Sequence, residues 1–222
     1  MARGLVYRAL TPRGGLRAAY ALLYHAGFFG RELHEWARRS LLATPMFLSQ
    51  CAEHGVDIAV ERMPYLSGPC RLELGSRIRF GGQVDILAAP TGAPLLRIED
   101  GVYLGHMVSF AVARRIELGR YVSVGGHSHI SDTDGHAQDN PDRPSWEVPA
   151  GEGDVAEVVI EENVQIGHGC LILKGVRIGA RSVIGAGSVV RTSIPADSVV
   201  MGNPARVVRR LQPVGDAAAG AP

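Results

Sequence analysis

The sequence has few cysteines and no motif that would pair them. Its 222 residues include only Cys51, Cys70 and Cys170, which lie far apart and form no CxxC pair. An odd count at this spacing excludes an even-numbered disulfide framework. Because no cleavable signal peptide opens the chain either, we expect a reduced, cytoplasmic protein.

Net charge and aromatic residues are also scarce. The 23 basic residues nearly balance the 22 acidic ones, and a net charge of +1 creates no overall field that would recruit nucleic acid. A single lysine, Lys174, stands among the basic residues, and no function is assigned to it. With 28 Gly against five Phe, six Tyr and two Trp, the core must consist of small aliphatic side chains, as in repetitive β architectures.

The first 45 residues differ from the rest of the chain. Seven Arg against Glu32 and Glu35 give this segment a charge of +5, which leaves −4 for the remaining residues. From Leu16 to Leu42, apolar residues recur at three- and four-residue intervals, which predicts one or two amphipathic helices, weakened at Gly27 and Gly30. We expect a helix that packs on the protein body or a neighbouring subunit; the alternative is an Arg-rich helix beside anionic lipid. No uncharged run is long enough to span a bilayer.

From residue 72 onward, the apolar residues follow a period of six. Aliphatic or phenylalanine side chains occupy positions 74, 80 and 86; 98, 104, 110 and 116; 118, 124 and 130; and 160, 166, 172, 178, 184 and 190. The next residue is often glycine or acidic, and the fourth after the aliphatic is small or β-branched. A helix of period 3.6 cannot produce this pattern, whereas hexapeptides of this kind form a parallel β-helix.

In such a fold, three hexapeptides close one coil, and coils stack at roughly 4.8 Å. We predict four or five coils: an imperfect one at 72–90, then 98–115, 118–135, 160–177 and 178–195. The domain boundaries are expected at 1–71 for the helical and lead-in segment, 72–211 for the β-helix, and 212–222 for a flexible tail. Two excursions interrupt the repeat. The short one, Ala88 to Pro94, needs no function, whereas the long one at 137–158 is a candidate working loop.

Particular motifs within the repeats resemble the hexapeptide-repeat acyltransferases, especially the sugar O-acetyltransferases. They are IGAGSVV at 184–190, the Ile194-Pro195 step, GNPARVVR at 202–209, and HISDTDGH at 129–136. The resemblance implies an all-β, left-handed parallel β-helix and a homotrimer that transfers an acetyl group from acetyl-CoA to a saccharide hydroxyl. It further implies a role in cell-surface polysaccharide or lipopolysaccharide assembly, in the cytoplasm or at the inner face of the membrane, without a metal.

The same resemblance places the catalytic base at His136. A neutral imidazole can remove the proton of a sugar hydroxyl as its oxygen attacks the thioester, and Asp132, Asp134 or a backbone carbonyl could hold the ring tautomer. His127 and His129 compete for the role, and as neighbours at i and i+2 of one strand they are expected to face the same side.

For acetyl-CoA, the resemblance implies a groove between neighbouring protomers. The donor site would include six residues by position: Gly167, His168, Ala186, Arg191, Arg206 and Arg209. Small residues let the thioester arm lie against backbone, and guanidinium groups suit phosphate. As an alternative, the glycines are present only because the corners of the β-helix require them, and Arg191 and Arg209 are exposed to solvent without binding a ligand.

The sequence departs from the family at three places, which bear mainly on the acceptor. Many relatives have tryptophan at Gln165 and a Thr-Lys pair at Arg191-Thr192, and the sugar acetyltransferases carry polar residues where this chain has Ala111, Val112 and Ala113. The sequence therefore does not identify the acceptor, and it does not decide between O-acetylation and N-acetylation.

Two other functions use the same fold. A γ-type carbonic anhydrase requires three histidines around zinc, two of them at i and i+5, and no histidine pair here has that separation. The second alternative is a non-catalytic β-helix that binds a saccharide or nucleotide-sugar.

Overall fold

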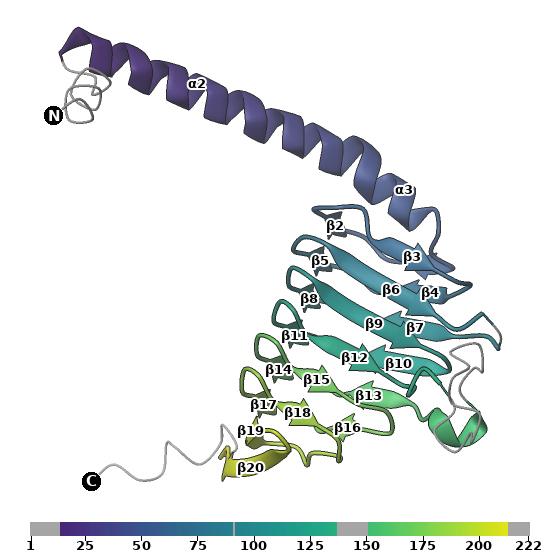
Figure 1. The fold of residues 1–222 in the computed structure, drawn as a ribbon. Helices are drawn as coiled ribbons and strands as arrows, with labels where there is room; N and C mark the ends of the chain where they lie inside the picture. The colour runs from purple at the N-terminus through teal and green to yellow at the C-terminus, as the bar shows by residue number, and fades with distance from the viewer. Residues whose placement is uncertain (1–13, 91, 137–150, 213–222) are drawn as a thin grey trace, which may run out of the picture.

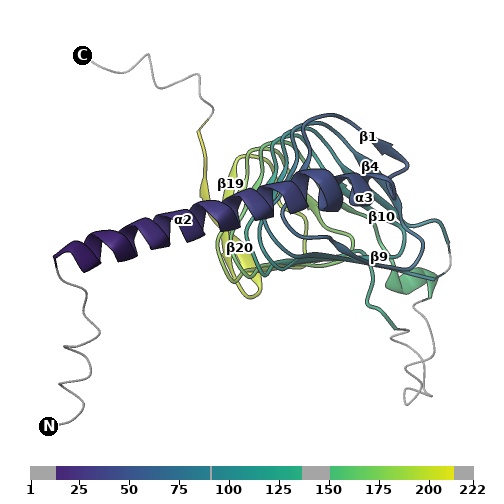
Figure 2. The ribbon, with the colours of Figure 1, turned by 90° about the horizontal axis from the view of Figure 1, so that it is seen from above.

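The computed structural model describes residues 14–90, 92–136 and 151–212. Figure 1 shows a long N-terminal helix followed by a stack of short strands wound around one axis. The strands form three sheets around a single apolar core, which Figure 2 shows along the stack. The predicted parallel β-helix with an N-terminal helical segment is confirmed. Of the segments predicted to lie off the repeat, residues 137–150 of the long excursion and 213–222 of the tail lie outside the described residues.

The N-terminal segment is one continuous helical rod. α2 (Gly15–Arg38) runs through Gly27 and Gly30 without a break, and the π-helical η1 (Arg39–Ala43) joins it to α3 (Thr44–Leu48). The rod is anchored at its C-terminal end, where Phe47 is buried and its ring contacts that of Phe80 at a centroid distance of 5.2 Å. Along the described part of the chain, we find no helix long and apolar enough to cross a bilayer.

Three sheets form the walls of the β-helix. Sheet A contains β1 (Glu53–His54), β4 (Arg71–Leu74), β7 (Leu95–Ile98), β10 (Arg115–Leu118), β13 (Val158–Ile160) and β16 (Arg177–Ile178). Sheet B contains β2 (Ala59–Val60), β5 (Arg79–Phe80), β8 (Tyr103–Leu104), β11 (Ser123–Val124), β14 (Gln165–Ile166), β17 (Val183–Ile184), β19 (Ser198–Gly202) and β20 (Ala205–Arg210). Sheet C contains β3 (Tyr65–Ser67), β6 (Val84–Ala88), β9 (Val108–Val112), β12 (His129–Ser131), β15 (Leu171–Ile172) and β18 (Val189–Val190).

The period of six is the spacing between inward-facing side chains on successive walls. Within one wall, the inward-facing side chains of successive coils stack on one another. In sheet A, Leu96, Ile116 and Val158 are aligned on neighbouring strands, and all three are fully buried. Small residues at the fourth position face the inside of the corners. There Ser128 Oγ donates to the Gly167 carbonyl of the next coil and accepts from the Cys170 N–H. Corner polar groups are thus satisfied from coil to coil.

The stack is longer than the repeat count predicted. Sheets A and C each have six strands, and the first coil begins at Glu53 rather than at residue 72, because β1, β2 and β3 pair in parallel with β4, β5 and β6. The six-residue pattern did not predict this coil, because both residues of β1, Glu53 and His54, are exposed and neither is apolar. At the other end β19 and β20 pair antiparallel, so the final strand reverses direction.

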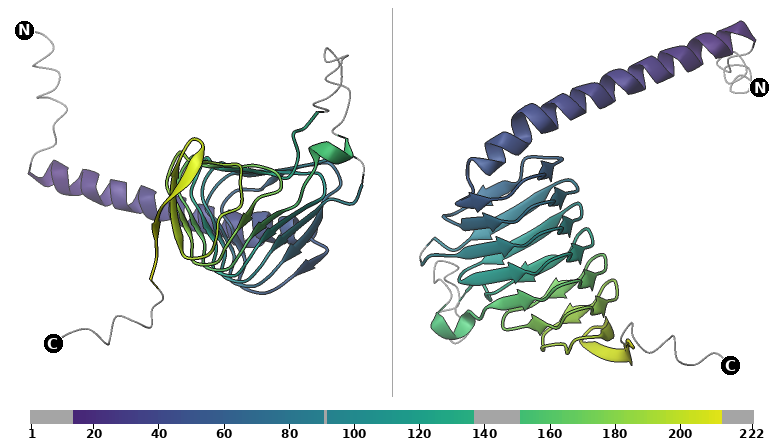
Figure 3. Two further views of the ribbon diagram at one scale, coloured as in Figure 1. Left: turned by 90° about the horizontal axis from the view of Figure 1, so that it is seen from below. Right: turned by 180° about the vertical axis from the view of Figure 1, so that it is seen from behind.

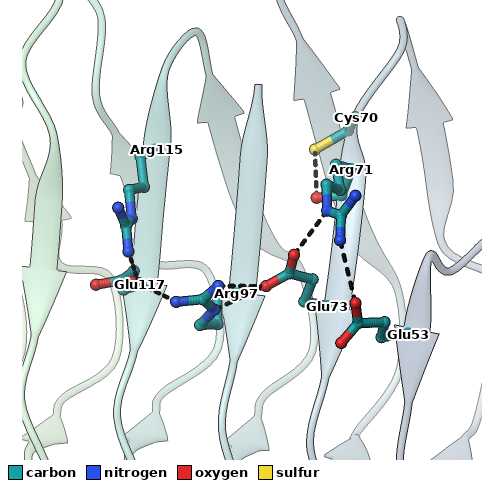
Figure 4. Close-up of polar contacts among 7 residues, drawn as sticks. All are labelled: Glu53, Cys70, Arg71, Glu73, Arg97, Arg115 and Glu117. Carbon is teal, nitrogen blue, oxygen red and sulfur yellow. Dashed lines mark hydrogen bonds and ion pairs between the residues drawn. The ribbon is translucent and has the colours of Figure 1, made fainter. Parts of the chain in front are cut away.

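The outer face of sheet A carries a charged ladder that links successive coils (Figure 4). Arg71 bonds Glu53 and Glu73, Arg97 lies between Glu73 and Glu117, and Arg115 also bonds Glu117. Hydrogen bonds from Arg71 and Arg97 lower the pKa of Glu73. Because Arg71 and Arg97 bond carboxylates of neighbouring coils, the ladder supplements the backbone pairing along the stack.

The outer face of sheet C has a different character. Its two outward columns contain small, apolar and neutral polar side chains and one carboxylate, Asp85: Tyr65, Asp85, Ser109, His129, Leu171 and Val189, then Ser67, Leu87 and Ala111. Charge depletion of this kind is typical of buried contact surfaces rather than of solvated ones.

Candidate active site

The chain leaves the stack at the corner that joins sheet C to sheet A. After β12, Thr133 pairs antiparallel with Val155, and the Asp134 N–H donates to the Asp154 carbonyl. The Ala156 N–H then donates to the Asp132 carbonyl. Residues 132–134 and 154–156 therefore form a narrow neck that fixes both ends of the long excursion. η2 (Glu152–Asp154) stands outside the stack at this neck (Figure 3).

Lys174, the single lysine, braces the neck from the next coil. Its Nζ donates to Asp134 Oδ2 at 2.5 Å and to the Gly153 carbonyl at 3.1 Å. One ammonium group therefore bonds both sides of the excursion, at Asp134 in the neck and at Gly153 in η2. Sequence reasoning left Lys174 without a role, although its rarity in a chain rich in arginine was a visible signal.

Asp132 supports the corner from inside. Its carboxylate is fully buried and accepts backbone N–H groups from Ala113, Arg114 and Arg115 at 2.6, 2.7 and 2.6 Å. A buried carboxylate with three such donors is strongly held. The two acids expected to orient His136 thus have other partners: Asp132 binds this backbone turn, and Asp134 binds Lys174.

His136 follows the neck and is exposed. The preceding residue, Gly135, has a φ of +81°, a left-handed conformation that favours glycine, and it lines a pocket of about 470 Å³. The base predicted from sequence is therefore adjacent in the chain to a pocket wall.

The two excursions build this pocket together. One wall is the short excursion that seemed to need no function, and the opposite wall is the neck of the long one; the lining is Leu87, Ala88, Ala89, Pro90, Gly92, Ala93, Val112, Ala113, Arg114, Thr133, Gly135, Gly151, Glu152 and Val155. Most of these residues are small or apolar, whereas Arg114 and Glu152 supply charge and Thr133 a hydroxyl. Val112 and Ala113 occupy positions where the sequence departs from the sugar acetyltransferases.

The corner between sheets B and C carries a column of imidazoles. The ring of His127 lies 6.1 Å from that of His106 in the preceding coil and 5.0 Å from that of His168 in the following one, measured between centroids. His127 has a φ of +57° and precedes β12, so it does not share a strand with His129 as expected. Sequence reasoning did not single out His106, because its distance from His127 in the chain hid their contact.

His129 does not belong to this imidazole column; it lies on the outer face of sheet C. Its Nδ1 is 2.8 Å from Ser109 Oγ, and burial lowers the pKa of its imidazole. A lowered pKa keeps the ring neutral near pH 7. None of the three candidate bases, His127, His129 and His136, is among the residues that line the pocket beside the neck; His136 directly follows the lining residue Gly135.

The residues proposed for the donor do not form one group. Gly167, His168 and Ala186 share the corner between sheets B and C, where backbones are so close that a Cβ on Gly167 would approach the Ala186 nitrogen to 2.6 Å. Arg191 follows β18 at the other edge of sheet C, whereas Arg206 and Arg209 are exposed on β20.

The width of sheet C separates the predicted base from the predicted donor corner. From His127 at the donor corner to Thr133 in the neck, the chain runs along β12 for six residues, which at about 3.3 Å each is roughly 20 Å. One chain alone therefore does not bring His136 to Gly167 and Ala186.

The described residues offer neither a metal centre nor a reactive thiol. No group of three His, Cys, Asp or Glu side chains within them could hold a metal ion. Burial raises the pKa of the Cys51 and Cys70 thiols to about 11, which leaves them protonated and poorly nucleophilic near pH 7.

Comparison with known proteins gives a family repeat and a shared fold. The bacterial transferase hexapeptide model of six repeats matches residues 157–192. Over 55 residues the chain is 53% identical to the galactoside O-acetyltransferase of Lactococcus lactis, covering 25% of this chain and 27% of the relative. Over 59 residues it is 42% identical to a 2,3,4,5-tetrahydropyridine-2,6-dicarboxylate N-acetyltransferase of Staphylococcus aureus, covering 27% of this chain and 25% of the relative. The chain thus matches about a quarter of the length of these curated relatives.

Solved structures align over most of the chain. A hexapeptide-repeat-containing acetyltransferase from Vibrio cholerae, complexed with acetyl coenzyme A, aligns with a TM-score of 0.52 and 26% identity, covering 81% of this chain and 84% of that one. An N-acyltransferase from Bacillus cereus in complex with dTDP and coenzyme A aligns with a TM-score of 0.59 and 15% identity, covering 77% and 89%, which shows the shared fold.

Proposed function

We propose that this chain, a hexapeptide-repeat protein of the bacterial transferase type, is an acetyltransferase that moves an acetyl group from acetyl-CoA to a hydroxyl of a saccharide. The observation that carries the proposal is the position of His136, which follows a braced neck and a pocket wall in a fold shared with an acetyl-CoA-bound enzyme. We assign the product to cell-surface polysaccharide or lipopolysaccharide assembly on the same resemblance that the sequence motifs carry.

His136 acts as the general base. Its neutral imidazole takes the hydroxyl proton as the oxygen attacks the thioester carbonyl, and the C–S bond then breaks while the imidazolium returns the proton to the departing thiolate. Backbone N–H groups at the donor corner stabilise the tetrahedral oxyanion. The ring tautomer is held by Asp134 or a backbone carbonyl rather than by Asp132, because three backbone N–H groups already occupy the Asp132 carboxylate.

The active site is completed between protomers. Since His136 and the Gly167–Ala186 corner lie at opposite edges of sheet C, a neighbouring copy must supply one of them. Sheet C carries fewer charges on its outer face than sheet A, which suits a buried contact, whereas the charged ladder keeps sheet A in solvent. A homotrimer with sheet C turned toward its axis places the base edge of one protomer beside the donor edge of the next.

Acetyl-CoA lies along the donor corner. Gly167, His168 and Ala186 face the thioester arm, since small corner residues let it approach the backbone. The exposed guanidinium groups of Arg206 and Arg209 on β20 meet the phosphates. Arg191, at the other edge of sheet C, contributes from the neighbouring protomer.

The acceptor occupies the pocket beside the neck. A volume of about 470 Å³ accommodates a sugar unit with a substituent, and the wall of Ala88, Ala89 and Pro90 suits the apolar face of a pyranose ring. Arg114 and Glu152 orient its polar groups. The relatives include both an O- and an N-acetyltransferase, so an amino sugar is the second acceptor class to test.

Substitution of His136 tests the proposal. We expect His136→Ala to lower turnover by about two to four powers of ten and to spare acetyl-CoA affinity, whereas His127→Ala and His129→Ala retain most of the activity. Free thiol is followed with acetyl-CoA and a panel of sugars, amino sugars and nucleotide-sugars. Unchanged turnover in His136→Ala removes that residue from the mechanism. Tight saccharide binding with no thiol release would favour the non-catalytic alternative.

A further inference from the structure

The exposed His106 has a fixed position in the fold and no role in the proposed mechanism. It lies between β8 and β9, at the corner that joins sheets B and C in the third coil. Its ring packs directly on the backbone of the preceding coil, where a Cβ on Gly82 would collide with it. Gly82 also has a φ of +123°, a conformation that favours glycine. The corner therefore has room for this imidazole only because Gly82 lacks a side chain.

One hydrogen bond determines which ring nitrogen of His106 carries the proton. The backbone N–H of Gln83 donates to His106 Nδ1 at 3.1 Å. A nitrogen that accepts a hydrogen bond has no proton of its own, so in the neutral ring the proton is on Nε2. Among the residues that the structure describes, none bonds this Nε2. His106 thus presents a free N–H donor on a ring whose orientation is fixed.

The acceptor pocket beside the neck has few polar groups to bind a sugar. Its polar side chains, among the described lining residues, are Thr133, Arg114 and Glu152. All three belong to the pocket walls, so one chain alone leaves the saccharide oxygens at the pocket opening without a protein partner. Polar groups that lose water need a replacement hydrogen bond. A donor from outside the chain would complete the pocket.

His106 lies at the height of this pocket but on the far side of sheet C. The pocket walls follow β6, β9 and β12, which are the sheet C strands of the second, third and fourth coils. β9 has His106 before its first residue and the lining residue Val112 at its end. The six residues from His106 to Val112 span roughly 20 Å at about 3.3 Å each. His106 therefore does not reach the pocket of its own chain.

We infer that His106 is an acceptor-binding residue that each protomer supplies to the pocket of its neighbour. The inference rests on the proposed function, whose homotrimer sets the pocket edge of one protomer beside the corner between sheets B and C of the next. Rotation about an axis along the stack keeps equal coils at equal heights, so His106 of one protomer faces the neighbouring pocket. Its Nε2–H donates there to a hydroxyl or ring oxygen of the saccharide.

The order of the coils supports this assignment. The donor residues Gly167 and Ala186 belong to the same corner as His106, but to the fifth and sixth coils. His136 leaves the stack after the fourth coil. Acetyl-CoA along the later coils and a saccharide held at the third coil therefore approach the proposed base from opposite directions. One corner of the β-helix then contacts both substrates.

Two substitutions of His106 test the inference, with methyl β-galactoside as the acceptor and free thiol as the readout. We expect His106→Ala to raise the acceptor KM about three- to tenfold, as for one lost hydrogen bond, and to leave the KM for acetyl-CoA unchanged. His106→Gln should retain more acceptor affinity, because its amide can accept from the Gln83 N–H and also donate. His54→Ala is the matched control, since His54 is exposed on β1, far from the pocket.

Mixed oligomers show whether His106 acts on a neighbouring pocket. His106→Ala chains are co-assembled with an excess of His136→Ala chains, which lack the base but retain His106. Nearly every pocket with a base then has a neighbour with an intact His106, so the acceptor KM should return to the wild-type value. Three results would overturn the inference: a KM that stays raised in this mixture, an unchanged KM for His106→Ala alone, or a particle mass for His106→Ala below that of the wild type.

Calorimetry separates this inference from the proposed function. The Kd of methyl β-galactoside is measured without acetyl-CoA for the wild type and for His106→Ala. Galactoside binding by a wild type that releases no thiol would refute the proposed enzyme, and the ratio of the two Kd values would still decide the role of His106. Thiol release at the wild-type KM by His106→Ala, with equal Kd values, would leave the enzyme standing and remove His106 from the acceptor site.

Discussion

Lys174 Nζ lies 2.5 Å from the carboxylate of Asp134, which stands two residues before His136 in the chain. The ammonium group belongs to the coil after the excursion, and the carboxylate belongs to the strand that enters it. This ion pair, with the bond from Lys174 to the Gly153 carbonyl, ties the proposed base to the rigid stack. The exposed fractions of the two side chains are 26% and 29%, so the pair is partly screened by solvent.

Removal of this brace should lower activity more than stability. We expect Lys174→Met to reduce kcat/KM about tenfold or more, because small displacements of a catalytic group are costly, while a partly exposed ion pair contributes at most about 1 kcal/mol to folding. Arg177→Met is the matched control, since Arg177 pairs with Glu161 away from the neck. Equal kinetic losses in both variants would show that Lys174 has no special relation to the site.

Asp132 should behave as a structural residue. Replacement by Ala leaves three backbone N–H groups without their acceptor at a buried corner, so we expect the free energy of unfolding to fall by about 3 kcal/mol or more. Urea denaturation measures this loss. If Asp132→Asn retained full stability but lost turnover, Asp132 would act on His136 rather than on the corner.

The partly buried His129 predicts a pH dependence of stability. Burial lowers the pKa of its imidazole from the usual value of 6.5, so below about pH 6.5 the unfolded chain binds a proton that the folded chain does not. Stability due to the neutral ring is present above that pH and is lost as the pH falls toward the folded pKa. We expect His129→Gln to flatten the decline in urea midpoint just below pH 6.5. An unchanged slope would assign the decline to other groups.

The ladder on sheet A should stabilise the stack in a salt-dependent way. Arg97 lies between Glu73 and Glu117, and its loss leaves the two carboxylates on the strands that flank β7 without a shared cation. We expect Arg97→Met to lower the free energy of unfolding by about 1 kcal/mol in low salt and by less in high salt. Arg120→Met is the control, because Arg120 is 3.8 Å from Glu162 and more exposed. A loss independent of salt would indicate packing by the Arg97 side chain instead.

The sequence predicted the repeat because each inward position recurs every six residues. Ile98, Leu104 and Phe110 occupy successive walls and are buried, and Ser128 satisfies corner groups as a small residue should. The first coil was missed because Glu53 and His54 place no apolar residue inward. β1 forms because it pairs with β4, which lies about 20 residues further along the chain, and a six-residue sequence period does not reveal such a pairing.

The site was predictable in part for a related reason. The motif predicts His136 as the base, and this stays a prediction, whereas the brace by Lys174 depends on a contact between residues 40 apart in the chain on different coils. The imidazole column of His106, His127 and His168 likewise exists only once the coils are stacked. The short excursion that begins at Ala88 lacks polar chemistry of its own and gains a role only because it faces the neck across the pocket.

Mixed oligomers of two inactive variants test the central claim, an active site shared between protomers. His136→Ala lacks the base, and Ala186→Trp fills the donor corner with an exposed side chain that leaves the core intact. Each variant alone should be inactive. After co-assembly, a base from one protomer can meet an open donor corner of the next, so activity should return to about a quarter of the wild-type value in a random mixture of trimers. A mixture no more active than its separate components would contradict the shared site.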